Sequence, residues 1–105
     1  LWTLRLSWIC MEVGMRSVIP NDSNEKCYLC GSYNGIQEHH IFGGPDRKKS
    51  ESFGLKVHLC VLCQDRVHGK DGKALMQNLH EIGQRAFEET YDRDKFRKEF
   101  RKSYL

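Results

Sequence analysis

The chain lacks an apolar run long enough to cross a membrane, and it has no repeats or low-complexity segments. Its most apolar stretch, LWTLRLSWICMEV, occupies residues 1–13 and contains Arg5. A membrane-spanning helix needs about 20 apolar residues, so this stretch is too short. It also lacks the small-residue cleavage site of a secretory signal peptide. These absences predict a cytoplasmic protein with no membrane partner.

A paired set of cysteines, as in a disulfide framework, is also missing. Of the five cysteines, four form two C-x-x-C pairs and Cys10 stands alone. An odd count without a secretory signal argues against disulfides, although two disulfides or free core cysteines remain the alternative. Two thiolate pairs, 29 residues apart in the chain, supply the four tetrahedral ligands that zinc prefers. The pairs predict a structural zinc site made of Cys27, Cys30, Cys60 and Cys63.

The length of 105 residues suits a single small domain with a thin core. Domains of this size often need a metal or disulfides for stability. The formal net charge of +3 is a mild basic bias that permits a nucleic-acid partner without establishing one. Residues 1–14 are either a translated upstream extension or a native strand, because Met11 and Met15 are both plausible starts.

The patterning predicts an α+β fold in three parts. Residues 1–20 form an N-terminal extension, residues 21–72 a zinc-stapled domain, and residues 73–105 a pair of C-terminal helices. The elements expected along the chain are a strand at 36–42, a polar loop at 43–52, a strand at 55–59, a short helix carrying Gln64 and His68, a helix at 73–90 and a last helix from Asp92 or Asp94.

The two C-terminal helices carry apolar residues at helical spacing. Phe96, Phe100 and Tyr104 are four apart, which favours packing over stacking on bases. The long helix should pack through Leu75, Leu79, Ile82 and Ala86, flanked by Met76 and Phe87.

The stretch EHHIFGG, residues 38–44, places two histidines side by side near the end of a predicted strand. Adjacent strand residues project to opposite faces, so a local bend is needed if both histidines serve one site. Taken alone, the pair favours a polar strand end, in which one histidine only satisfies a backbone carbonyl. His68 follows the last cysteine by five residues, on the short helix. His58 lies within a strand, and His80 is expected at the surface or partly packed.

The combination of CYLCG, EHHI, LCVLC and a helical histidine resembles the HNH endonuclease family, which has a ββα-metal fold. The resemblance covers roughly residues 25–72 and extends to small HNH proteins of phages and prophages. It implies metal-dependent hydrolysis of DNA, with phage or host DNA-processing proteins as further partners. The implied cofactors are a structural Zn²⁺ and a catalytic divalent ion (Mg²⁺, Mn²⁺, Ni²⁺ or Zn²⁺).

By this resemblance, His39 and His68 are ligands of the catalytic ion and His40 is the general base. Gln64 stands where many family members have a further histidine, and its amide oxygen could still bind a hard ion. If the register differs by one residue, Glu38 binds the ion and His39 is the base.

The asparagine that gives the family its middle letter is absent between Gly43 and Cys60. A backbone carbonyl, Lys56 or His58 could orient the base in its place. Arg47, Lys48 and Lys49 are candidate phosphate contacts or, alternatively, part of a solvated face.

Two rival hypotheses remain from the sequence. One is a DNA-binding or adaptor protein with the HNH fold and no catalysis, which Gln64 and the absent asparagine favour. The other is a zinc-stapled protein–protein module whose C-terminal aromatic residues dock a partner. The sequence does not indicate the oligomeric state.

Overall fold

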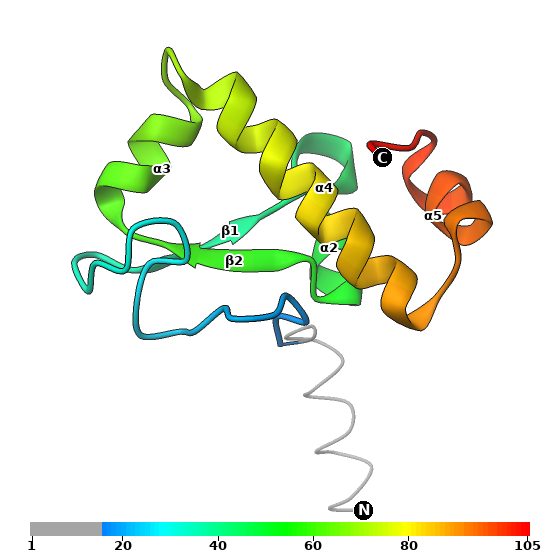
Figure 1. The fold of residues 1–105 in the computed structure, drawn as a ribbon, viewed down its shortest axis with the longest axis horizontal. Helices are drawn as coiled ribbons and strands as arrows, with labels where there is room; N and C mark the ends of the chain where they lie inside the picture. Colours follow the sequence, from blue (N-terminus) through cyan, green and yellow to red (C-terminus); the bar gives the residue numbers. More distant parts are fainter. Residues whose placement is uncertain (1–15) are drawn as a thin grey trace, which may run out of the picture.

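The computed structural model describes residues 16–105. The predictions for the first 15 residues, including the extension and Cys10, lie outside this part of the chain. The observed elements, in chain order, are β1 (Gln37–His40), the 3-10 helix η1 (Gly44–Asp46), α2 (Arg47–Phe53), β2 (Lys56–Leu59), α3 (Val61–Val67), α4 (Gly72–Thr90) and α5 (Arg93–Phe100). The α+β prediction is confirmed, and Figure 1 shows how these elements are arranged.

The two strands form a small antiparallel sheet in which His39 faces Val57 and His40 faces Lys56. Because side chains alternate along a strand, the sheet has two different faces. One face is buried and holds His39, Val57 and Leu59. The other is polar, and its side chains are Glu38, His40, Lys56 and His58. With α3 following β2 directly, the centre of the molecule is a small ββα-like arrangement.

Helices α4 and α5 build an aromatic core beside this centre (Figure 1). Phe96 and Phe100 are buried, and the Phe100 ring lies 4.6 Å from that of Phe42. Asp92 caps α5 by accepting a hydrogen bond from the Lys95 amide at 2.8 Å. Both predicted helices are therefore confirmed, as is the packing role of the aromatic residues. The buried side chains of α4 include Leu79, Ala86 and Phe87, while Leu75, Met76 and Ile82 are partly buried.

The prediction of a loop over residues 43–52 is wrong, because η1 and α2 occupy most of it. Pro45 starts the first turn, and Gly54 ends α2 with a φ of 70°, which glycine adopts without strain. Ser50 is fully buried and fixes the helix to the sheet. Its hydroxyl accepts from the Phe42 amide at 3.1 Å and donates to the Leu55 carbonyl at 2.6 Å.

Residues 16–22 pack against the sheet and its ends. The Ser17 hydroxyl donates to the Lys56 carbonyl at 2.6 Å, and the Val18 amide donates to the Gly54 carbonyl at 2.9 Å. Asp22 accepts from the His58 amide at 2.8 Å and lies 2.7 Å from its Nδ1. The sheet thus has α3 and α4 on one side and this segment on the other (Figure 1). Within residues 16–105, no helix is long and apolar enough to span a membrane.

Candidate metal and catalytic site

The four cysteines of the C-x-x-C pairs converge at one end of the sheet. Their sulfur atoms all lie within 4.8 Å of one another, and the Cys30 and Cys60 sulfurs are 3.6 Å apart. A tetrahedron of thiolates around zinc, with bonds of about 2.3 Å, has edges of about 3.8 Å. The cluster therefore has the dimensions to hold one metal ion, as its spacing in the chain predicts.

Local backbone structure places each cysteine pair. In the first turn the Gly31 amide donates to the Cys27 carbonyl at 2.9 Å, and Gly31 has a φ of 79°, which favours glycine. In the second pair, Cys60 is the N-cap of α3, and its sulfur accepts a hydrogen bond from the Cys63 amide at 3.4 Å. The Tyr28 amide donates to the His58 carbonyl at 2.8 Å, which joins the first turn to β2.

The directions of the thiol pKa shifts are consistent with a cluster that holds a cation. Burial raises the pKa of Cys27, but hydrogen bonds from backbone amides, led by that of Cys60, lower it by more. The resulting pKa of Cys27 is about 6. Burial and the three neighbouring cysteines raise the pKa of Cys63 to about 12. One thiol ionises readily while another resists, because several thiolates repel one another in so small a space. A bound cation removes this repulsion.

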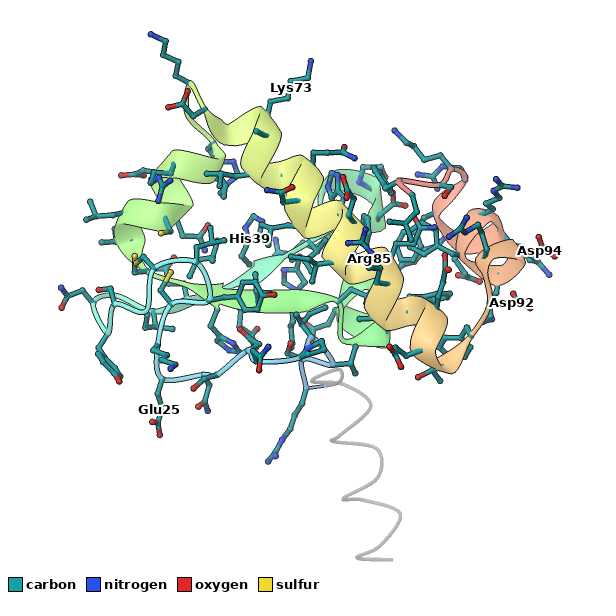
Figure 2. The ribbon with its side chains drawn as sticks, in the orientation of Figure 1. Glu25, His39, Lys73, Arg85, Asp92 and Asp94 are labelled. Atoms are coloured by element: carbon teal, nitrogen blue, oxygen red, sulfur yellow. The ribbon has the colours of Figure 1, made fainter. Side chains whose placement is uncertain are left out.

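A second group of donors lies at the buried face of the sheet. The His39 and His68 ring centroids are 6.0 Å apart, and the Gln64 side chain lies beside the His39 imidazole. His39 is only 8% exposed, and its Nε2 is the one buried side-chain nitrogen or oxygen in residues 16–105 without a hydrogen-bond partner. Figure 2 shows His39 on the side of the sheet that faces α3 and α4.

The side chains of this second group are of types that could hold a divalent metal ion. Burial lowers the pKa of His39 and the nearby His68 lowers it further, while Gln64 raises it by less. His39 is therefore neutral near pH 7, the form in which imidazole binds metals. An unpartnered ring nitrogen in the interior, next to another imidazole and an amide, has the character of a ligand set. The structure brings together the three side chains that the resemblance implies: His39, Gln64 and His68.

His40 lies on the polar face and has a different neighbour. Its Nε2 is 2.7 Å from a carboxylate oxygen of Glu51 in α2. The other oxygen of Glu51 accepts from the Lys56 ammonium at 2.6 Å, and Lys56 also lies 3.1 Å from Glu38. Glu38 thus points to the same face as His40 and away from His68, which speaks against the alternative in which Glu38 binds the catalytic ion.

Neither of the two side chains considered as substitutes for the missing asparagine is hydrogen-bonded to His40 in residues 16–105. His58 is paired with Asp22, and Lys56, which faces His40 across the sheet, shares the Glu51 carboxylate with it. The sequence did not mark Glu51 as a site residue, because the composition of residues 43–52 predicts a loop. Pro45 followed by Gly54 was the available signal, since proline at the first turn and glycine after the last one is typical of a helix.

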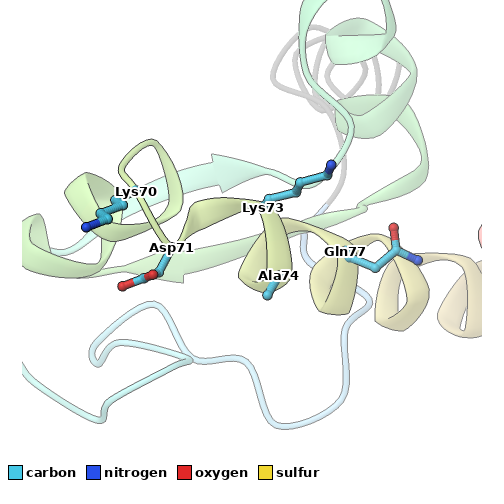
Figure 3. Close-up of a pocket in the computed structure, with 5 residues that line it drawn as sticks. All are labelled: Lys70, Asp71, Lys73, Ala74 and Gln77. Atoms are coloured by element: carbon cyan, nitrogen blue, oxygen red, sulfur yellow. The ribbon is translucent and has the colours of Figure 1, made fainter.

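The candidate phosphate contacts have unequal surroundings. Arg47 and Lys48 are exposed on α2, whereas the Lys49 ammonium donates to the Glu99 carbonyl and so ties α2 to α5. A separate open hollow of about 550 Å³ lies at the start of α4 (Figure 3). None of its lining residues belongs to the cysteine cluster or to the His39 group; they are Lys70, Asp71, Lys73, Ala74 and Gln77.

The chain was compared with protein-family models, curated proteins and solved structures. None of the three comparisons finds a match.

Proposed function

We propose that the protein is a zinc-stabilised, metal-dependent endonuclease of the HNH type that hydrolyses DNA phosphodiester bonds. The observation that carries the proposal is the unpartnered Nε2 of His39, buried beside His68 and Gln64. An interior nitrogen without a partner costs stability, so a ligand for it is the simplest explanation. The neighbouring His40 and the ββα-like arrangement add to this support.

The residues have separate roles in the proposed hydrolysis of a phosphodiester bond. His39, His68 and Gln64 would hold a divalent ion, which supplies a positive charge for the phosphate and the leaving oxygen when bound. His40 accepts the proton of the attacking water, because the imidazole of histidine is the most common general base in enzymes. Arg47 and Lys48 are free to approach the DNA backbone, which would make binding sensitive to salt.

One observation favours a second candidate, a DNA-binding protein of the same fold without catalysis. His39 and His40 leave β1 on opposite faces of the sheet. In the nuclease, the phosphate therefore has to lie across the free edge of β1, where both faces are within reach. If DNA does not reach that edge, the fold binds DNA and does not cut it. The third hypothesis was docking of a partner on the C-terminal aromatic residues. Two of these residues, Phe96 and Phe100, are buried and so do not offer a docking surface.

A plasmid-nicking assay with Mg²⁺, Mn²⁺, Ni²⁺ or Zn²⁺ tests the proposal. We expect His40→Ala to lower the rate by about two orders of magnitude or more, the usual contribution of a general base. Zinc content and circular dichroism should not change. His58→Gln is the matched control, because His58 lies on the same face and is also paired with a carboxylate.

The expected results separate the two candidates. The nuclease predicts that His58→Gln retains nicking and that wild-type cleavage requires a divalent ion. Full nicking by His40→Ala would overturn the assignment of the base. Salt-sensitive DNA retention without cleavage under any of the four ions would favour the non-catalytic DNA-binding protein.

A further inference from the structure

The polar face of the sheet holds a chain of charged side chains centred on Glu51. One oxygen of Glu51 lies 2.7 Å from His40 Nε2, and the other accepts from the Lys56 ammonium at 2.6 Å. Lys56 is almost completely buried and is also paired with Glu38 at 3.1 Å. Because both of its oxygens are engaged, the Glu51 carboxylate is held in one orientation against the His40 ring.

We propose that Glu51 is the positioning residue for His40. It holds the imidazole in the tautomer with its hydrogen on Nε2, so that the lone pair on Nδ1 faces solvent and the attacking water. The catalytic part of this inference rests on the proposed nuclease function. The orientation and the tautomer can be measured without it.

The tautomer follows from hydrogen-bond chemistry. An ionised carboxylate can only accept, so the short contact requires that His40 Nε2 donates. Burial raises the pKa of Glu51, but the hydrogen bonds from Lys56 and His40 lower it by more, which keeps the group ionised at neutral pH. In a neutral imidazole whose Nε2 carries the hydrogen, Nδ1 keeps its lone pair.

The other ring nitrogen is available for chemistry. The contact with Glu51 is the only hydrogen bond of the His40 imidazole in residues 16–105. Nδ1 of His40 is not among the buried unpartnered atoms of residues 16–105, and the His40 side chain keeps 14% of its surface exposed. Glu51 thereby fills the role of the missing asparagine, from a helix in place of a loop.

Because of Lys56, the tautomer of His40 depends on the second acceptor oxygen of residue 51. A glutamine at position 51 has one acceptor oxygen where the carboxylate has two. The Lys56 ammonium forms the stronger, charge-assisted bond and should capture that oxygen. The amide nitrogen then turns toward His40 and donates to Nε2, which forces the ring hydrogen onto Nδ1. Glu51→Gln should therefore reverse the tautomer of His40.

Nitrogen-15 NMR of the histidine rings in the zinc-loaded full chain tests the first step. The spectra are recorded at about pH 8.5, two units above the ordinary pKa of a free imidazole, about 6.5. We expect the wild type to show the hydrogen on Nε2 of His40 and Glu51→Gln to show it on Nδ1, with His40→Ala identifying the signal. A wild-type hydrogen on Nδ1, or no change in Glu51→Gln, would overturn the inference.

A second substitution supplies a rescue. Lys56→Met removes the competing donor with little change in volume, so the amide oxygen of Gln in Glu51→Gln/Lys56→Met can again accept from His40. This double variant should return the hydrogen to Nε2. A purely structural role for Glu51 gives no reason for such a return, and failure to return would contradict the role assigned to Lys56.

Nicking kinetics test the catalytic step. Glu51→Gln should lower kcat about a hundredfold, because it removes the base lone pair from the water, while KM for the plasmid stays within about twofold. The double variant should recover to the rate of Lys56→Met alone. If Glu51→Gln reverses the tautomer but keeps kcat, Glu51 is not a positioning residue. If the wild type does not nick DNA at all, the proposed function fails, and NMR still decides the tautomer.

Discussion

We expect the buried Nε2 of His39 to lower the stability of the chain when no ion is bound and to favour binding of a metal ion. A buried polar atom without a partner costs about 1–3 kcal/mol, and this atom has none in residues 16–105. We expect His39→Leu to raise the free energy of unfolding of the zinc-loaded chain by about 1 kcal/mol when no other divalent ion is present. Urea denaturation followed by circular dichroism measures the change. A less stable variant would contradict the assignment of a cost to this atom.

Divalent ions should reverse that order of stability. An ion that binds only the folded chain stabilises it in proportion to the logarithm of its concentration. Wild type should therefore gain stability with Co²⁺ or Ni²⁺, whereas His39→Leu should not. Gln64→His should gain more, since imidazole binds these ions better than an amide does. His80→Leu is the control: His80 stacks on Phe42 outside the ligand set, so its response to the ions should equal that of wild type.

At the residue scale, the sequence predicts the residues of known metal-binding motifs. It misses a residue whose position depends on the formation of a short helix. The four cysteines carry their spacing in the chain, so their convergence could be predicted. His39 and His68 could be placed together through a resemblance. Glu51 could not, because it reaches His40 only when α2 forms and Gly54 turns the chain back into β2. Nothing in the local spacing of residues 40 and 51 marks them as partners.

At the element scale, the turn between α3 and α4 sets the position of His68 relative to His39, the two proposed ligands of the catalytic ion. His68 is the C-cap of α3, and α4 begins at Gly72. A Cβ at Gly72 would overlap the Val67 carbonyl and lie 2.9 Å from the Arg66 carbonyl oxygen. These are backbone atoms at the end of α3, so they can yield only if the helix moves.

Gly72→Ala should therefore lower the free energy of unfolding by about 2–3 kcal/mol, the upper part of the range for overpacked sites. It should also weaken Co²⁺ or Ni²⁺ binding, because relief of the overlap moves His68 relative to His39. Chemical denaturation and metal titration measure the two effects. Lys73→Ala, exposed at the next position, is the matched control and should change both by little. Equal stability of the two variants would show that the corner can relax without cost.

The longer helices were predictable because their apolar residues recur at helical spacing, as those of α4 and α5 do. Helix α2 has seven residues, and Ser50 is its only fully buried one. No apolar stripe marks it, and it is held by Ser50, which bonds to Phe42 and Leu55 beside the strands, and by Lys49, which bonds to the distant α5. A short polar helix held by tertiary contacts carries little periodic signal.

At the scale of the whole molecule, the cysteine cluster connects the segment before β1 to the turn between β2 and α3. Cys60 caps α3, and α3 carries Gln64 and ends at His68. The cysteine cluster therefore supports the proposed catalytic site through a helix, without sharing a residue with it. The small size of the chain makes this support important, since a core of this extent provides only a few kcal/mol by itself.

Removal of zinc should accordingly abolish both the fold and the second metal site. Zinc binding contributes about 10–16 kcal/mol in zinc-finger peptides, which is comparable to the whole stability of a usual domain, about 5–15 kcal/mol. We expect a zinc chelator or Cys60→Ser to eliminate the cooperative unfolding transition, the helical circular dichroism and Co²⁺ or Ni²⁺ binding at His39 together. Cys10→Ser, outside the two C-x-x-C pairs, should keep one zinc ion per chain and all three properties. A folded, cooperative chain without zinc would show that the aromatic core around Phe96 and Phe100 suffices for stability, and the role of the cysteines would then be limited to local order around α3.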